Sequence, residues 1–140
     1  AGMILYTGNK KVTEEDFSGF TKSLEKAGML DKLEESKIDA ASAISGCGPA
    51  FVFMFIEALA DGGVKCGLPR DKALLYAAET LFGSAKMVLE SEMCPSELKD
   101  MVCSPGGTTI CGVEALEEYG FRNAIMKATE ACNNKSENMK

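Results

Sequence analysis

The segment 104–109 (SPGGTT) contains the residues of this chain whose types and spacing are best suited to chemistry. Its two glycines allow the backbone to come close to a ligand. A helix that starts just after them would offer unpaired N–H groups and a positive dipole end to an anion such as a carboxylate. The hydroxyl of Thr109 could donate or accept one more hydrogen bond. The same residue types also suit an ordinary turn between helices, with Thr108 as N-cap, and spacing alone favours this second interpretation.

Other sources of catalytic chemistry are scarce. The chain has no histidine, so it lacks the usual general acid–base and any Ser-His or Cys-His nucleophile pair. We expect the cysteines to be small buried side chains in a reducing compartment, and we expect no metal site and no disulfide. None of the six has the two-residue spacing of a zinc or redox motif, the set being Cys47, Cys66, Cys94, Cys103, Cys111 and Cys132.

Composition narrows the class of protein. The 140 residues suit one ordinary domain, and 46% hydrophobic with 26% charged residues is typical of a soluble globular protein. The net charge of −6 without a basic cluster argues against nucleic acid as a partner, because phosphate binding needs concentrated Lys and Arg. The longest apolar run, 50–56, is far too short to cross a bilayer. We therefore expect a cytoplasmic protein without a membrane span.

The first part of the chain has the pattern of a strand, a helix and a second strand. Residues 3–7 are strand-like, and Thr13 looks like an N-cap followed by three acids in the first turn of a helix. Gly28 is predicted to end this helix, and 29–34 to form the second strand. Parallel strands normally lie among neighbours that this segment does not supply. The pattern therefore predicts the end of a parallel α/β domain whose earlier part has been removed.

Only helices are expected from residue 38 onward. The helix at 49–64 is apolar nearly all round, so it must be buried centrally or against a second subunit. The helix at 70–90 carries an apolar seam, and together the two predict a homodimer. Further helices are expected over 38–44 and 96–102, after the 103–109 loop as far as 119, and from 121 to 132, followed by a frayed polar tail at 133–140.

Three long segments carry a family resemblance. They are 45–53 (SGCGPAFVF), 57–70 (EALADGGVKCGLPR) and 98–113 (LKDMVCSPGGTTICGV). Each resembles a signature of the pyrroline-5-carboxylate reductases, and they occur in the family's order. The resemblance covers essentially the whole chain, which makes it far more specific than a short glycine motif.

The resemblance implies a two-domain oxidoreductase that reduces 1-pyrroline-5-carboxylate to L-proline with NADPH or NADH. It implies a mainly α fold, in which a helical-bundle dimerisation and substrate-binding domain (37–140) follows a short β-α-β remnant of a Rossmann domain (1–36). A homodimer is implied, which is often assembled into a larger oligomer. No G-x-G-x-x-G follows a strand, so no cofactor-binding residue is assigned. The fragment alone is expected to bind no cofactor and to be inactive.

The resemblance also implies roles for single residues. Ser104, Gly106, Gly107 and Thr108 would hold the substrate carboxylate, and Thr109 would be the catalytic residue that bonds the ring nitrogen. Glu92 matches a family acid near the substrate, although a solvated charge at a helix end is an equal alternative.

Three cysteines depart from the family pattern. Cys47 stands where serine is common, Cys94 where histidine is frequent and Cys111 where alanine is usual. We expect Cys111 to be packed rather than reactive.

Two other functions fit parts of this pattern. One is a different imine or hydroxy-acid reductase with a related helical domain, which the SPGGTT segment argues against. The other is a pure dimerisation module whose loop binds nothing.

Overall fold

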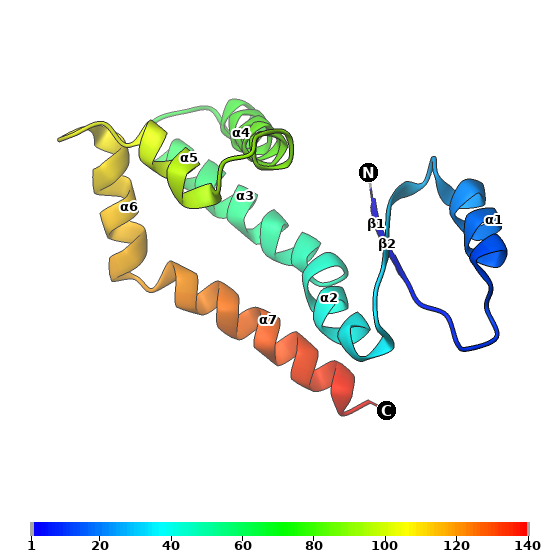
Figure 1. The fold of residues 1–140 in the computed structure, drawn as a ribbon. Coiled ribbons are helices and arrows are strands. Elements are labelled where there is room, and N and C mark those ends of the chain that lie inside the picture. Colours follow the sequence, from blue (N-terminus) through cyan, green and yellow to red (C-terminus); the bar gives the residue numbers. More distant parts are fainter. Residues whose placement is uncertain (1, 140) are drawn as a thin grey trace. The chain divides into compact units, whose positions relative to one another are not determined.

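The structure is a computed structural model that describes residues 2–139 (Figure 1). Its first elements are strand β1 (Gly2–Tyr6), helix α1 (Glu14–Leu24) and strand β2 (Gly28–Lys32). The two strands pair in parallel, with Gly2 opposite Gly28 and Tyr6 opposite Lys32. The predicted strand-helix-strand order is therefore confirmed.

The role predicted for Gly28 was wrong. Helix α1 ends at Leu24, and Gly28 is the first residue of β2 rather than the helix terminator. A Cβ atom at Gly28 would lie 2.1 Å from the carbonyl oxygen of Gly2. Glycine is needed here because the two strands approach closely at their first pair, which is a contact between segments distant in sequence.

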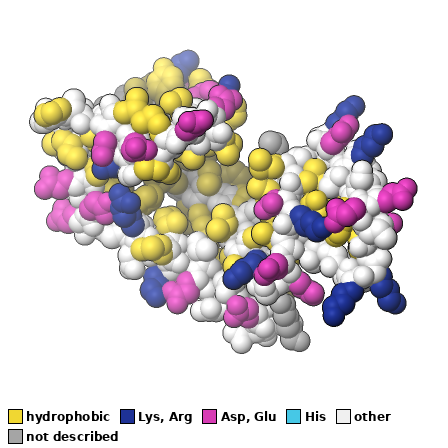
Figure 2. Space-filling model, viewed as in Figure 1, with side chains coloured by type: hydrophobic (Ala, Val, Ile, Leu, Met, Phe, Trp, Pro, Cys, Tyr) yellow, Lys and Arg dark blue, Asp and Glu magenta, His cyan; other side chains and the backbone are white. Residues whose placement is uncertain are grey.

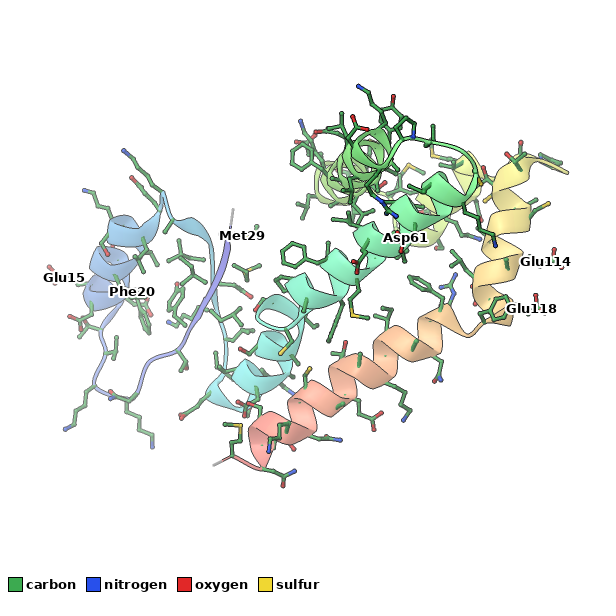
Figure 3. The ribbon with its side chains drawn as sticks, turned by 180° about the vertical axis from the view of Figure 1, so that it is seen from behind. Glu15, Phe20, Met29, Asp61, Glu114 and Glu118 are labelled. Carbon is green, nitrogen blue, oxygen red and sulfur yellow. The ribbon has the colours of Figure 1, made fainter. Side chains whose placement is uncertain are left out.

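Aromatic packing joins α1 to the strands. The ring of Tyr6 in β1 lies 5.6 Å from that of Phe17 and 5.3 Å from that of Phe20, measured between centroids. The ammonium of Lys32 in β2 sits 3.6 Å from the centroid of Phe17. These contacts pack one face of α1 against the sheet, while Glu15 points away from it (Figure 3).

A capping box begins α1. The hydroxyl of Thr13 accepts a hydrogen bond from the backbone N–H of Asp16 at 3.2 Å. The carboxylate of Asp16 in turn accepts from the backbone N–H of Thr13 at 2.8 Å and from its hydroxyl at 2.7 Å. The predicted N-cap at Thr13 is confirmed, and two of the helix's otherwise unpaired N–H groups gain partners.

This capping box predicts a pH dependence of α1. The backbone N–H and the hydroxyl of Thr13 lower the pKa of Asp16 below its ordinary value of 3.8. A carboxyl pKa that is lower in the folded state stabilises the fold above the unfolded value, and this contribution is lost as pH falls through the folded value. We expect the Asp16 carboxyl carbon, followed by NMR from pH 6 downward, to titrate below 3.8. Thr13→Ala removes the hydroxyl but keeps the backbone N–H, so it should raise the midpoint part of the way toward that value. An unchanged midpoint in the variant would contradict the role of the hydroxyl.

The rest of the chain is helical, as predicted. A 3-10 turn, η1 (Glu35–Lys37), leads into α2 (Ile38–Ser45), α3 (Gly48–Lys65), α4 (Arg70–Glu90), α5 (Pro95–Val102), α6 (Thr108–Glu118) and α7 (Phe121–Glu137). The expected frayed tail was wrong, because α7 continues to Glu137. The side chain of Asn133 donates to Glu137 at 3.0 Å, and Ser136 donates to Asp39 of α2 at 3.1 Å. The second of these contacts anchors the end of the helix.

The described chain falls into two compact units. Unit 1 consists of residues 2–49 together with 127–139, and unit 2 of residues 50–126. The candidate loop at 104–109 lies wholly within unit 2. This division reflects contacts within the chain, so the predicted domain boundary between residues 36 and 37 stays a prediction.

Very little of this chain is buried. Among residues 2–139 the buried hydrophobic residues are four alanines, with Ala43 in unit 1 and Ala60, Ala73 and Ala77 where α3 meets α4 in unit 2. Large apolar side chains remain exposed instead, including Phe53, which is 68% exposed on the helix predicted to be buried. Figure 2 shows such side chains on the surface that the helices form. Monomeric proteins seldom expose so much apolar surface, so a further surface is needed to cover these helices.

One helical stretch also passes a simple test for a membrane span. Residues Glu35–Lys65 have a mean hydropathy of 1.7 over their most apolar window, and only 11% of that window is buried. The apolar run 50–56 is only a part of this stretch. The stretch is longer because η1, α2 and α3 follow one another almost without interruption. Length and composition alone do not distinguish a span from the apolar helix of a subunit interface.

Candidate functional site

A tight turn connects α5 to α6. The carbonyl oxygen of Ser104 accepts a hydrogen bond from the N–H of Gly107 at 3.0 Å, and Gly106 has a φ of +66°. Proline at the second turn position and a glycine with positive φ at the third are the marks of a type II turn. Pro105 and Gly106 occupy these two positions, so the local sequence explains why the chain reverses here.

Gly107 holds the position just before α6. A Cβ atom there would lie 2.3 Å from the hydroxyl of Ser104 and 3.1 Å from its carbonyl oxygen. The Ser104 hydroxyl is therefore directed at the start of the helix. Thr108 is the first residue of α6 and not its N-cap, so the alternative that made it the cap was wrong. The cap residue has no side chain, and a glycine cannot accept the hydrogen bonds that a serine or threonine would.

The start of α6 therefore offers free donors. No side chain of the described residues caps it, so the N–H groups of its first turn have no partner inside the helix. The helix dipole adds positive potential at the same point. Ser104, Thr108 and Thr109 are exposed, and their hydroxyls come from this turn and the first helical residues. Such an arrangement can bind a carboxylate and make a further hydrogen bond to a neighbouring polar atom.

Glu92 comes from a different segment. It lies in the short connection between α4 and α5 and is exposed, whereas the other predicted site residues belong to the α5–α6 turn and the start of α6. Its place near a substrate stays a prediction.

The cysteines differ from the expectation of buried side chains. Cys66, Cys94 and Cys111 are exposed and the other three are half-buried. Cys111 was expected to be packed, but its exposed thiol donates to the carbonyl of Gly107 at 3.6 Å. The cysteines are not buried because the helices that carry them leave much of their apolar surface uncovered. Within residues 2–139, no three metal-ligating side chains are grouped closely enough to hold an ion.

A second capping box, which sequence reasoning missed, holds α5 ahead of the turn. The N–H of Cys94 donates to the carboxylate of Glu97 at 2.8 Å, and this hydrogen bond lowers the pKa of Glu97. Pro95 occupies the first helical position, where its missing N–H costs nothing. The sequence signal for it was a glutamate three residues after the cap residue. Such a glutamate normally indicates a capping box only when the cap residue is serine or threonine.

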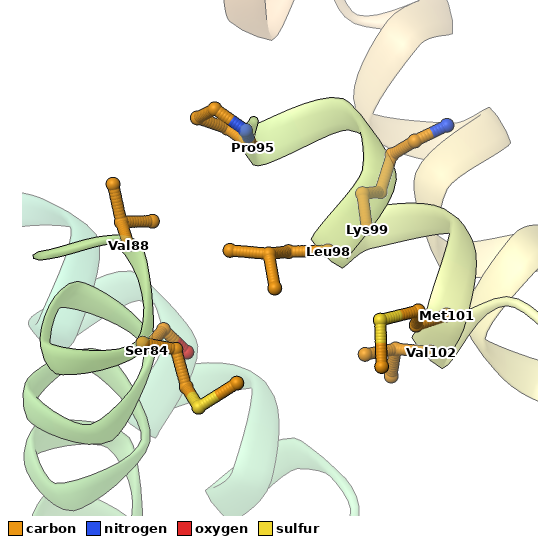
Figure 4. Close-up of a pocket in the computed structure, with 8 residues that line it drawn as sticks. Ser84, Val88, Pro95, Leu98, Lys99, Met101 and Val102 are labelled. Atoms are coloured by element: carbon orange, nitrogen blue, oxygen red, sulfur yellow. The ribbon is translucent and has the colours of Figure 1, made fainter. Parts of the chain in front are cut away.

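An apolar groove runs between α4 and α5 in unit 2, and sequence reasoning missed it as well. Its volume is about 340 Å³, and Figure 4 shows Leu98 directed into it from α5, opposite Ser84 and Val88 of α4. The spacing of Leu98, Met101 and Val102 along one helical face was the available signal. An apolar groove suits hydrophobic side chains and not a small carboxylate, so it is distinct in chemistry from the turn before α6.

Comparison with solved structures gives the same fold. The chain superposes on a Plasmodium falciparum pyrroline carboxylate reductase with NADP bound, with a TM-score of 0.91 and 39% identity over 98% of this chain and 55% of that one. It also superposes on a pyrroline-5-carboxylate reductase from Coxiella burnetii with a TM-score of 0.92 and 29% identity, over 99% of this chain and 52% of that one.

Comparison with curated proteins gives relatives of one kind. A pyrroline-5-carboxylate reductase of Escherichia coli K12 is 48% identical over 99% of this chain and 52% of its own length. Human pyrroline-5-carboxylate reductase 2 is 45% identical over 93% of this chain and 41% of its own length. The chain thus spans about half the length of the relatives that it matches.

The family description "Pyrroline-5-carboxylate reductase dimerisation" matches residues 35–139. With three-quarters of its length matched in this way, the chain belongs to the pyrroline-5-carboxylate reductase dimerisation family.

Proposed function

We propose that this chain is the substrate-binding and dimer-forming part of an NAD(P)H-dependent reductase that converts 1-pyrroline-5-carboxylate to L-proline. The observation that carries the proposal is the uncapped start of α6 behind the Ser104–Gly107 turn. The substrate is a ring with one carboxylate and one imine nitrogen. A site for it needs a group of donors for the anion and one further hydroxyl, and both are present at this turn.

Each residue of the turn has a separate role in this proposal. The carboxylate binds the N–H group of Thr108 and the hydroxyl of Ser104. The Gly107 N–H, which donates to the Ser104 carbonyl, and the positive φ of Gly106 shape the turn. The hydroxyl of Thr109, in the first turn of α6, bonds the ring nitrogen and orients the imine. Holding the carboxylate and the nitrogen fixes the ring, so that the reacting carbon faces one direction. Glu92 is the acid nearest to the substrate in this proposal.

The hydride comes from NADPH or NADH, which supplies the reducing chemistry when it is bound. The described residues of β1-α1-β2 do not suit a dinucleotide phosphate. The first turn of α1 carries Glu14, Glu15 and Asp16, where a phosphate would need free N–H groups and no negative charge. We therefore assign no cofactor-binding residue in this chain, and we propose that residues 2–139 alone bind no cofactor and are inactive.

The quaternary structure we propose is a homodimer formed by the helical domain, residues 37–140, with residues 1–36 belonging to the dinucleotide-binding domain. The family match begins at residue 35, which supports this boundary. The exposed apolar side chains of α3 and α4 support a covering partner. In this arrangement the apolar stretch Glu35–Lys65 lies against protein and not lipid, and the enzyme acts in the cytoplasm. Assembly beyond the dimer is part of the same proposal.

Replacing Thr109 by alanine tests the substrate contact. In an enzyme preparation that contains this chain with a dinucleotide-binding domain, we expect kcat/KM to fall about 10-fold, which corresponds to the loss of one hydrogen bond to the substrate. The rate of proline formation is measured through the oxidation of NADPH. Thr109→Ser keeps the hydroxyl and should retain most of the activity.

A matched control is Thr80→Ala. This exposed threonine lies on α4 and donates to the carbonyl of Tyr76 at 2.7 Å, so its loss removes a comparable helix-surface hydroxyl. It should leave kcat/KM unchanged. An unchanged rate in Thr109→Ala with an intact dimer would instead give the loop a purely structural role. The chain would then be a dimerisation module, which is a second function that its exposed apolar surface favours.

A further inference from the structure

Two of the six cysteines belong to unit 1, and they meet across a large distance in sequence. Cys47 follows the end of α2, and Cys132 lies in the C-terminal half of α7. Their thiols are in hydrogen-bonding contact with each other. The other four cysteines are all in unit 2. Both thiols are half-buried, so small reagents can still reach them.

A separate hydrogen bond also joins α2 to α7. The hydroxyl of Ser136 donates to the carboxylate of Asp39 at 3.1 Å, across 97 residues of sequence. Ser136 is one helical turn beyond Cys132, and Asp39 is two turns before Cys47. α2 ends at Ser45, and the backbone N–H groups of Gly46 and Cys47 both donate to the carbonyl oxygen of Ser42, which holds Cys47 at the end of the helix.

Asp39, Ala43 and Cys47 follow one another at intervals of four residues, along one side of α2 and the turn after it. Ala43, in the middle of this side, is only 3% exposed. The two ends of this side, Asp39 and Cys47, each contact α7.

We propose that Cys47 and Cys132 form an oxidisable dithiol that closes an intramolecular disulfide and fixes the end of α7 to the end of α2. The proposal concerns a covalent modification site, and it does not depend on the substrate site before α6. Neither cysteine belongs to that site. A disulfide needs its two side chains close together, and the contact between the two thiols meets this condition.

The hydrogen bond indicates an order for the two thiols. The hydrogen bond with Cys47, together with burial, raises the pKa of the Cys132 thiol, so Cys132 keeps its proton longer. Cys132 is therefore the weaker nucleophile of the pair and acts as the resolving sulfur, because the thiolate is the nucleophile.

The reaction requires an oxidant, for which a low-molecular-weight disulfide such as oxidised glutathione is suitable. The Cys47 thiolate attacks one glutathione sulfur, forms a mixed disulfide and releases the first glutathione thiolate. Cys132 loses its proton and attacks the Cys47 sulfur, which forms the protein disulfide and releases the second glutathione. Two electrons pass from the two protein thiols to the reagent, which leaves as two thiols.

The bond should also change the stability of the chain. A link from Cys47 to Cys132 closes a loop that contains all of unit 2, residues 50–126. Closing a long loop restricts the unfolded chain more than the folded one. We expect oxidation to raise Tm by about 5 °C or more, and dithiothreitol to reverse this shift.

The test uses the full 140-residue chain treated with oxidised glutathione. We expect the intact mass to fall by about 2 Da, as for two lost hydrogens, and peptide mapping without reductant to find Cys47 joined to Cys132. Cys47→Ser and Cys132→Ser should each abolish the link. Cys66→Ser is the matched control, because it removes an exposed cysteine of unit 2, and it should leave the link intact.

Alkylation of the unaltered chain keeps the test independent of whether the variants fold. After oxidation, iodoacetamide should modify the four cysteines of unit 2 and spare Cys47 and Cys132. Glutathione adducts without an internal link, or disulfide-linked dimers on a non-reducing gel, would overturn the proposal. Either result would leave the substrate site untouched, because that site is tested by Thr109→Ala.

Discussion

Replacing Gly107 by alanine is expected to lower kcat/KM about 100-fold while the chain stays folded, as if two substrate contacts of about 1.4 kcal/mol each were lost. The added Cβ would lie 2.3 Å from the hydroxyl of Ser104, which must rotate away. The carbonyl of Ser104, at 3.1 Å, must also yield slightly. The first movement displaces the hydroxyl that we assign to the substrate carboxylate, and the second shifts the turn that places the Thr108 N–H. The effect should therefore appear mainly as a higher KM.

The matched control for this variant is Gly112→Ala. Gly112 lies on α6, and a Cβ atom there would meet nothing within 4 Å. Alanine also favours the helix over glycine by about 1 kcal/mol, so this variant should fold at least as well as the parent chain. Steady-state kinetics and thermal unfolding of both variants form the measurement. Equal kinetics for the two, with Gly107→Ala still folded, would remove the turn from the proposed substrate site.

Replacing Phe82 by aspartate is expected to weaken self-association at least about 100-fold, because an unpaired carboxylate buried at an interface costs several kcal/mol. Phe82 lies on α4 seven residues from both Leu75 and Leu89, so the three form one stripe along the helix. In the single chain Phe82 is 68% exposed and Leu89 79% exposed. Sedimentation over a range of concentrations measures the dissociation.

Thr80→Ala controls for changes to α4 that do not touch this stripe. Thr80 is an exposed polar residue two positions before Phe82, about half a turn round the same helix, and its replacement should leave the dissociation constant nearly unchanged. If the stripe were ordinary surface, Phe82→Asp would sediment like the parent chain. A parent chain that is monomeric at micromolar concentration would also contradict the homodimer.

Local sequence signals predicted most helix starts and stops correctly. Thr13 caps α1 because its hydroxyl and the Asp16 carboxylate are three residues apart and need no distant partner. Pro105 and Gly106 produce the turn before α6 for a similar reason, since one requires a negative φ and the other permits a positive one. Such features depend only on neighbouring residues, so a single sequence contains all the information that they need.

Other features could not be predicted because their partners lie far away in sequence. Gly28 looked like a helix terminator, yet its lack of a side chain serves the close pairing with Gly2. The polar tail of α7 looked frayed, yet Ser136 is held by Asp39 of α2. In both cases the deciding contact forms only once the chain has folded back on itself.

The sequence by itself determined the order of the elements, the mainly α fold and the type of turn at the candidate site, because each of these follows from hydrogen bonds and backbone preferences within about four residues. The tertiary structure decided which side chains meet. It brought Cys47 to Cys132, placed Ser136 against Asp39 and left the stripe on α4 uncovered. These outcomes depend on how separate helices pack, and packing is a property of the folded chain that no local pattern encodes.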